Sequence, residues 1–124
     1  MYHQDWIIRQ ISSFIQMVGI VLFKKDNIQI NIYDESNSAK IHLLYERLIE
    51  LINQLKINEA EDLLFESIDA SDLNYVKIAL DFYDRLNKLS DGELEIADFN
   101  REEIKSGIDD VLKLYNISLN LFME

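Results

Sequence analysis

Cysteine and proline are absent from this 124-residue sequence, and glycine occurs only three times. Without cysteine the chain has no disulfide bond, no thiolate nucleophile and no thiolate metal ligand. Because all-β folds depend on many tight turns built from glycine and proline, the scarcity of both residues favours helices. The sequence therefore predicts an all-α fold.

Recognisable catalytic motifs are also missing. The chain has two histidines, and it contains no glycine-rich phosphate loop, no G-x-S-x-G element and no H-E-x-x-H element. We therefore expect no catalytic residue, no cofactor and no bound metal. Acid–base catalysis by a buried carboxyl group leaves no motif in a sequence, so a catalytic protein is kept as an alternative.

Basic residues are scarce, since 12 lysines and arginines face 23 acidic residues for a net charge of −11. Such a surface repels phosphate backbones and anionic lipid head groups, so we expect neither nucleic acid nor a membrane as a partner. The first residues include Asp5 and no basic cluster, unlike a signal peptide. The longest apolar run, residues 17–23, is far shorter than the ~20 residues of a membrane span. We predict a cytoplasmic protein with one domain over residues 1–124.

Amphipathic spacing predicts five helices, at residues 4–24, 39–55, 59–68, 72–89 and 101–115. Asn58 with Glu61, Ser71, and Asn100 with Glu103 are the expected N-terminal caps. Residues 90–98, which contain Gly92, are predicted to form a loop, and residues 116–124 to continue the last helix and dock. Residues 26–35 alternate isoleucine with polar residues and predict either an extended connector or an edge strand.

The first predicted helix, residues 4–24, is apolar on nearly every side. Its polar residues form one narrow stripe that lacks lysine, which argues against a helix lying on a membrane surface. A helix this apolar must be covered by the rest of the chain or by a second copy of it. Its surplus apolar surface predicts a homodimer, with a candidate interface made of Trp6, Ile7, Phe14, Val18 and Val21.

The predicted helices that begin near residues 39 and 73 are spaced like successive tetratricopeptide repeats. Ala60 stands where the second helix of such a repeat approaches the first closely, but Leu48 replaces the expected glycine and no proline ends the unit. The pattern predicts a long N-terminal helix packed on two stacked antiparallel helical hairpins similar to tetratricopeptide units.

Three groups of polar residues have a chemical and a simpler interpretation. His42 and Glu46 lie four residues apart and are interpreted as a solvated pair rather than metal ligands. Residues 87–98 place Gly92 at the sixth position of a calcium loop, but positions one and three are Asn87 and Leu89, so we interpret the segment as an acidic surface loop. The remaining acidic clusters are solvated helix faces or a docking face for a basic protein partner: Glu59, Glu61, Asp62, Glu66, Asp69, Asp109 and Asp110.

The block Gln-Asp-Trp-Ile-Ile-Arg-Gln-Ile at residues 4–11, followed by residues 23–26 and 57–65, resembles a family of small bacterial proteins of unknown function. This resemblance covers most of the chain and implies an all-helical cytoplasmic protein, without an activity, ligand or catalytic residue. From the residues we expect a non-catalytic interaction or scaffold module. The alternative is a small-molecule or metal-binding helical protein, catalysis included, with a cavity between the first helix and the hairpins.

Overall fold

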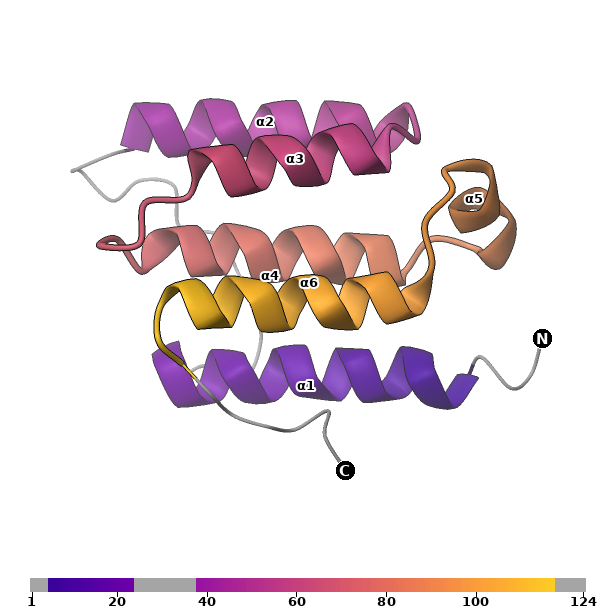
Figure 1. Cartoon of the computed structure of the whole chain (residues 1–124), viewed down its shortest axis with the longest axis horizontal. Coiled ribbons are helices and arrows are strands. Elements are labelled where there is room, and N and C mark those ends of the chain that lie inside the picture. Colours follow the sequence, from indigo (N-terminus) through magenta and orange to yellow (C-terminus); the bar gives the residue numbers. More distant parts are fainter. Residues whose placement is uncertain (1–4, 24–37, 118–124) are drawn as a thin grey trace.

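A computed structural model describes residues 5–23 and 38–117, and every regular element in these ranges is an α-helix (Figure 1). The all-α prediction is confirmed, with six helices in this part of the chain rather than five. The helices are α1 (Asp5–Phe23), α2 (Ser38–Asn53), α3 (Ile57–Ser67), α4 (Asn74–Asn87), α5 (Asp91–Ile96) and α6 (Arg101–Leu114). The predictions for residues 26–35 and 118–124 lie outside the described residues.

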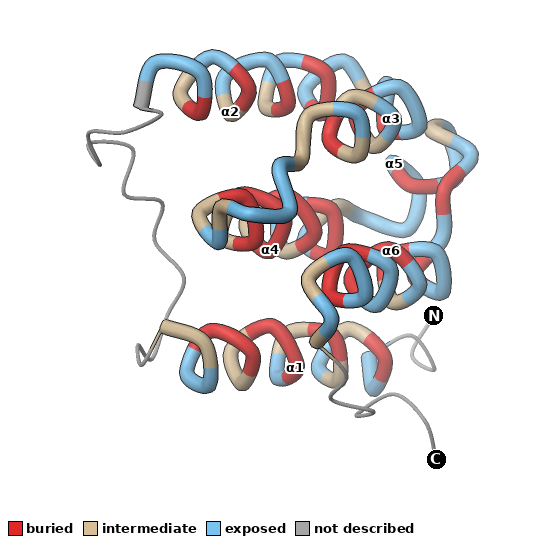
Figure 2. The backbone as a smooth tube through the Cα atoms, turned by 60° about the vertical axis from the view of Figure 1, so that its left-hand side comes forward, coloured by how far each residue is buried: buried red, intermediate tan, exposed pale blue. Residues whose placement is uncertain are grey.

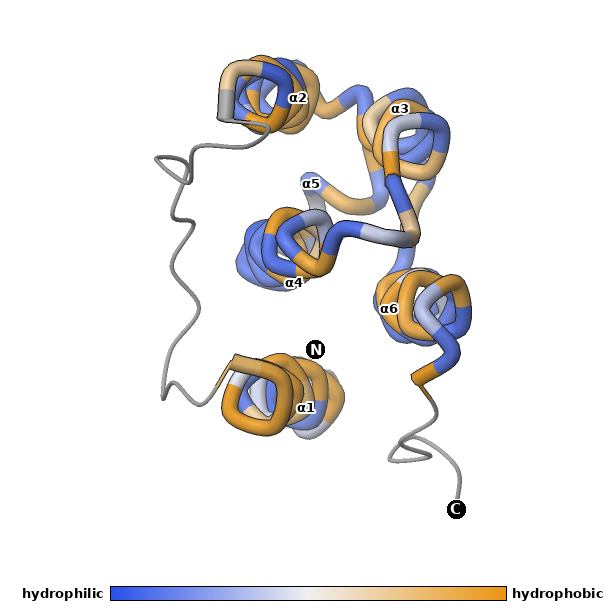
Figure 3. The backbone as a smooth tube through the Cα atoms, turned by 90° about the vertical axis from the view of Figure 1, so that its left-hand side faces the viewer, coloured by the Kyte–Doolittle hydropathy of each residue, from blue (hydrophilic) through white to orange (hydrophobic). Residues whose placement is uncertain are grey.

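The helices form three layers, seen end-on in Figure 3. The paired helices α2 and α3 form one layer, α4 and α6 form the next, and α1 packs on the opposite side of α4 and α6. The short helix α5 lies at one end of the stack, where the chain passes from α4 to α6. This arrangement leaves α1 at the edge of the fold, with one side facing α4 and α6.

The centre of the fold is α4, not the more apolar α1. Nine of the 14 residues of α4 are buried, because this helix contacts α2, α6 and α1. Only six of the 19 residues of α1 are buried. Figure 2 shows these buried residues along the side of α1 that faces the stack, and exposed residues along its outer side.

Close approach between α4 and α6 requires a glycine. A Cβ atom added at Gly107 would lie 2.2 Å from the hydroxyl oxygen of Tyr83, which is completely buried. Real Cβ atoms do not tolerate such a distance, so a larger residue at position 107 requires either the buried Tyr83 ring or the two helices to move. The glycine therefore leaves room for the Tyr83 ring between α4 and α6.

Of the N-terminal caps predicted at Asn58, Ser71 and Asn100, only that of Asn100 is confirmed. The Asn100 side chain accepts a hydrogen bond from the backbone N–H of Glu103, and the Glu103 side chain accepts one from the backbone N–H of Asn100. Asn58 is not a cap, because it lies inside α3 and donates to the carbonyl oxygens of residues 97 and 98. Ser71 is not a cap either, because it donates to the Asp69 carboxylate and α4 begins only at Asn74.

The predicted loop at residues 90–98 is wrong, because residues 91–96 form α5. Ser90 and Glu93 make the same reciprocal capping pair as the start of α6, and Gly92 lies in the first turn rather than ending a helix. The expected continuation of the last helix is also wrong. Helix α6 ends at Leu114. Asn116 follows with a φ of 60°, in the left-handed region that is common just after the end of a helix.

Candidate interaction surfaces

The outer side of α1 exposes large apolar side chains. Trp6, Ile20 and Val21 are 54%, 46% and 51% exposed. These side chains come from both ends of the helix, and the exposed Ser13 lies between them. Figure 3 shows that α1 is hydrophobic around most of its circumference, including the side that faces away from the stack. Three of the seven large apolar side chains that the described residues expose therefore lie on this one helix.

The candidate interface predicted from the sequence is corrected by this geometry. Ile7, Phe14 and Val18 are buried against the chain's own core, so they cannot contact a partner. Trp6 and Val21 are exposed, as an interface requires, and Ile20 belongs to the same side but was not predicted. The sequence showed a helix apolar on all sides, and only the tertiary structure reveals which side α4 and α6 cover.

Two lysines from the neighbouring helices hold the aromatic ends of α1. The Lys105 ammonium lies 6.0 Å from the centre of the Trp6 ring, and the Lys77 ammonium lies 5.0 Å from the centre of the Phe23 ring. Contacts between a cation and an aromatic face at exposed sites contribute about 0.5–1 kcal/mol each. The Lys105 contact leaves more than half of the Trp6 surface exposed.

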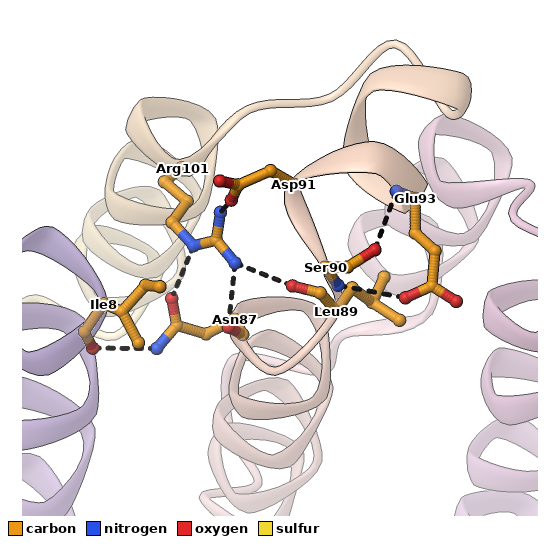
Figure 4. Close-up of polar contacts among 7 residues, drawn as sticks. All are labelled: Ile8, Asn87, Leu89, Ser90, Asp91, Glu93 and Arg101. Carbon is orange, nitrogen blue, oxygen red and sulfur yellow. Dashed lines mark hydrogen bonds and ion pairs between the residues drawn. The ribbon is translucent and has the colours of Figure 1, made fainter. Parts of the chain in front are cut away.

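A buried arginine ties four parts of the chain together at one end of the stack (Figure 4). The guanidinium of Arg101, only 5% exposed, donates to the Leu89 carbonyl at 2.7 Å, the Asn87 carbonyl at 3.2 Å and the Asn87 side chain at 3.3 Å. It also pairs with the Asp91 carboxylate at 2.6 Å. The Asn87 amide in turn donates to the Ile8 carbonyl of α1 at 2.9 Å. Because each of the three guanidinium nitrogens donates to a protein acceptor, we interpret this cluster as structural.

This cluster also corrects the interpretation of residues 87–98 as an acidic surface loop. Asn87 stands at the first position of the calcium pattern, but it is buried and bonded to Arg101 and Ile8. The segment folds into α5 and its cap instead of a loop. Within residues 5–23 and 38–117, no group of three or more histidine and acidic side chains is arranged to hold a metal ion. The Nε2 atom of His42 lies 2.9 Å from the Glu46 carboxylate on an exposed helix face, which confirms the solvated pair.

The acidic residues of α3 and α6 gather around a half-buried carboxyl group. Glu61 accepts a 2.6 Å hydrogen bond from the Tyr83 hydroxyl, and both side chains lie where α3 meets α4. Burial raises the pKa of Glu61 despite this bond, and the charges of Glu103, Asp62 and Asp110 raise it further. Burial also raises the pKa of Tyr83, so its hydroxyl stays protonated and donates. Glu61 is therefore part of the packing, and the docking of a basic partner on this face stays a prediction.

A shallow hollow of about 220 Å³ lies between α2 and α4. Its basic side chains already have partners, since Arg85 bonds to Asp81 and to the Tyr45 hydroxyl, both at 2.8 Å, and Lys88 pairs with Asp84 at 3.0 Å. Sites for drug-sized ligands usually enclose about 300–1,000 Å³. The hollow is smaller than these sites, and its geometry does not favour a small-molecule function.

Among the described helices, α1 alone has the length and composition of a membrane span, and a third of its most apolar 18-residue window is buried inside the fold. Core helices of soluble proteins and N-terminal signal sequences can have the same length and composition. Here α1 packs against both α4 and α6 and receives a hydrogen bond from Asn87. These contacts are those of a helix that belongs to the folded domain.

The fold and its surfaces define an all-α protein with a strongly apolar helix at the edge of a layered stack. The chain belongs to a family of unknown function, DUF6483, whose sequence pattern matches residues 1–116. The expectation of a family of unknown function is thus confirmed. Searches of curated proteins and of solved structures find no match to the chain.

Proposed function

We propose that the protein is a non-catalytic interaction module that binds another polypeptide through the outer side of α1. The observation that supports this proposal is the exposure of Trp6, Ile20 and Val21 on one helix. Tryptophan is enriched among the residues that dominate binding energy at protein interfaces. The other four exposed large apolar side chains of the described residues lie singly on separate segments, so such side chains are concentrated on α1.

The charge distribution supports α1 as the binding surface. This helix carries one acidic and one basic residue, Asp5 and Arg9, in a chain with a net charge of −11. By contrast, α3 carries four acidic residues and no basic residue. A partner that approaches α1 therefore meets little electrostatic repulsion and has few charges to desolvate.

In this proposal the protein is cytoplasmic, is not an enzyme, and binds neither nucleic acid nor membranes. The two helix pairs, α2 with α3 and α4 with α6, form a scaffold that resembles stacked tetratricopeptide hairpins. The role of this scaffold is to hold α1 rigidly. The inner side of α1 packs on the scaffold, and its outer side is available to the partner. The Arg101 cluster supports this role because it fixes α1 to the end of α4 through Asn87.

Site-specific photo-crosslinking in cells tests the proposal. A photoreactive amino acid at Ser13, exposed in the middle of α1, is compared with one at Leu43, which is 66% exposed on α2. We expect a discrete polypeptide adduct from position 13, visible by mass spectrometry, that disappears when Trp6→Glu is added. If position 13 gives no polypeptide adduct beyond that of position 43, the proposed function is wrong.

A further inference from the structure

We infer that the polypeptide covering α1 is a second copy of this chain, packed antiparallel across a two-fold axis at Ser13. This inference rests on the proposed function and names its partner. A two-fold interface requires a surface that is complementary to itself. If one residue of the first subunit contacts a second residue of the other subunit, the symmetry repeats the same contact with the subunits exchanged. The exposed side of α1 has this property.

The exposed side chains are spaced symmetrically about Ser13. Trp6 lies seven residues before Ser13 and Ile20 seven residues after it, and all three are exposed. Residues seven apart lie on the same side of a helix, two turns from one another. An antiparallel pair of α1 helices centred on Ser13 therefore places each Trp6 opposite the Ile20 of the other subunit. The small Ser13 side chains meet at the centre, where the two helices approach most closely.

The polar residues of α1 fit the same register. In the antiparallel arrangement Arg9 lies close to Gln16 of the second copy, so each guanidinium faces an amide oxygen. The two Arg9 side chains are then separated by eight residues, about 12 Å along the axis. A parallel arrangement would place Arg9 opposite Arg9 and Asp5 opposite Asp5, and like charges that face each other destabilise an interface. Charge therefore selects the antiparallel pair.

The charge of the chain makes α1 a suitable surface for a second copy. Two molecules that each carry a charge of −11 repel one another over most of their surface. On α1 the single acid and single base cancel, so the helices can approach without added repulsion. The remaining long-range repulsion is screened by salt, and the dimer should therefore tighten as sodium chloride rises from 20 to 150 mM.

The absence of native cysteine allows a direct test by disulfide cross-linking of single-cysteine variants. In the antiparallel pair Ser13→Cys faces itself and cross-links on mild oxidation. Ile20→Cys lies about 21 Å along the axis from its counterpart and does not cross-link with itself. It does cross-link when mixed with Trp6→Cys. Leu43→Cys on α2 gives the background level of collisional cross-linking.

Light scattering of the cysteine-free protein completes the test. We expect a dimer at micromolar concentration, and we expect Trp6→Glu to weaken it at least about 30-fold, because tryptophan is among the residues that dominate binding energy at protein interfaces. Circular dichroism verifies that the exposed substitution leaves the fold intact. Self-cross-linking of both Ser13→Cys and Ile20→Cys would overturn the antiparallel register.

A monomer at micromolar concentration would overturn the inference outright, and two further measurements say what covers α1 instead. If photo-crosslinking at Ser13 then yields a polypeptide of different sequence, the proposed function stands while the self-association does not. If the monomer co-sediments with lipid vesicles and Trp6→Glu abolishes this, a lipid surface covers α1, and both the inference and the proposed function fail.

Discussion

Replacing Arg101 by methionine tests whether the buried cluster holds the end of the helix stack together. Methionine fills a similar volume, but it has no donor for the carbonyl groups of Asn87 and Leu89 or for the Asn87 side chain. The substitution leaves the half-exposed Asp91 carboxylate free to return to water. We therefore expect the loss to come from the buried acceptors rather than from the ion pair.

The expected cost follows from the acceptors that lose their partner. A buried polar group left without a hydrogen bond costs about 1–3 kcal/mol, and Arg101→Met leaves two backbone carbonyl groups and one side-chain oxygen without this donor. Water can reach some of these groups because they lie at the end of α4, so we expect about 3 kcal/mol. For a domain whose total stability is about 5–15 kcal/mol, this lowers the melting temperature by roughly 10 °C.

Urea denaturation followed by circular dichroism measures this loss, and two variants separate its causes. Asp91→Asn removes the exposed partner and should cost less than about 1 kcal/mol. Arg101→Lys keeps the charge but has a single compact ammonium group in place of the guanidinium fork, so it should lose most of the stabilisation. A loss below about 1 kcal/mol for Arg101→Met, or equal losses for Arg101→Met and Asp91→Asn, would show that the cluster is not a structural tie.

Two further substitutions test the packing of α3 and α6 on α4, both by thermal and urea denaturation. Folding raises the pKa of Glu61 above its ordinary value of 4.5, so the folded protein binds this proton more tightly than the unfolded chain does. The free energy of unfolding should therefore rise as the pH falls through this raised pKa. Glu61→Gln should be more stable than the parent at pH 7 and lack that pH dependence, whereas the exposed Glu66→Gln should keep it. Gly107→Ala should lower the free energy of unfolding by about 1–3 kcal/mol, because the added Cβ atom would overlap the Tyr83 hydroxyl. The control Gly92→Ala should be neutral or stabilising, because its Cβ atom has its nearest contact at 3.9 Å. Equal stability of the two alanine variants would contradict the proposed role of Gly107 between α4 and α6.

Local sequence patterns predict the helices of this chain well where no distant residue competes for the same side chain. Asn100 and Glu103 form the predicted cap because both side chains are free to bond to each other's backbone. Asn58 and Glu61 have the same spacing but different partners. The Asn58 amide bonds to carbonyl groups about forty residues later, and Glu61 accepts from Tyr83. Tertiary contacts that no local pattern contains therefore decide between identical motifs.

The short helix α5 shows a different kind of error, since its signal was present in the sequence. Ser90 and Glu93 have the capping spacing, but Gly92 suggested a helix end. In the first turn of a helix the backbone amides lack helical partners in any case, so a glycine there costs less than one in the interior. By contrast, nothing in the sequence indicated that Arg101 would be buried against Asn87, because the two residues meet only after α4 and α6 have packed.

The contrast between α1 and α4 is the strongest argument that this fold is built to be covered. Four of the 14 residues of α4 are charged, yet α4 lies at the centre with nine buried residues. Only two of the 19 residues of α1 are charged, yet α1 lies at the edge with six. A chain selected for its own core alone would bury its most apolar helix. The position of α4 at the centre, with Trp6, Ile20 and Val21 of α1 left exposed, therefore supports the proposal that a second molecule covers α1.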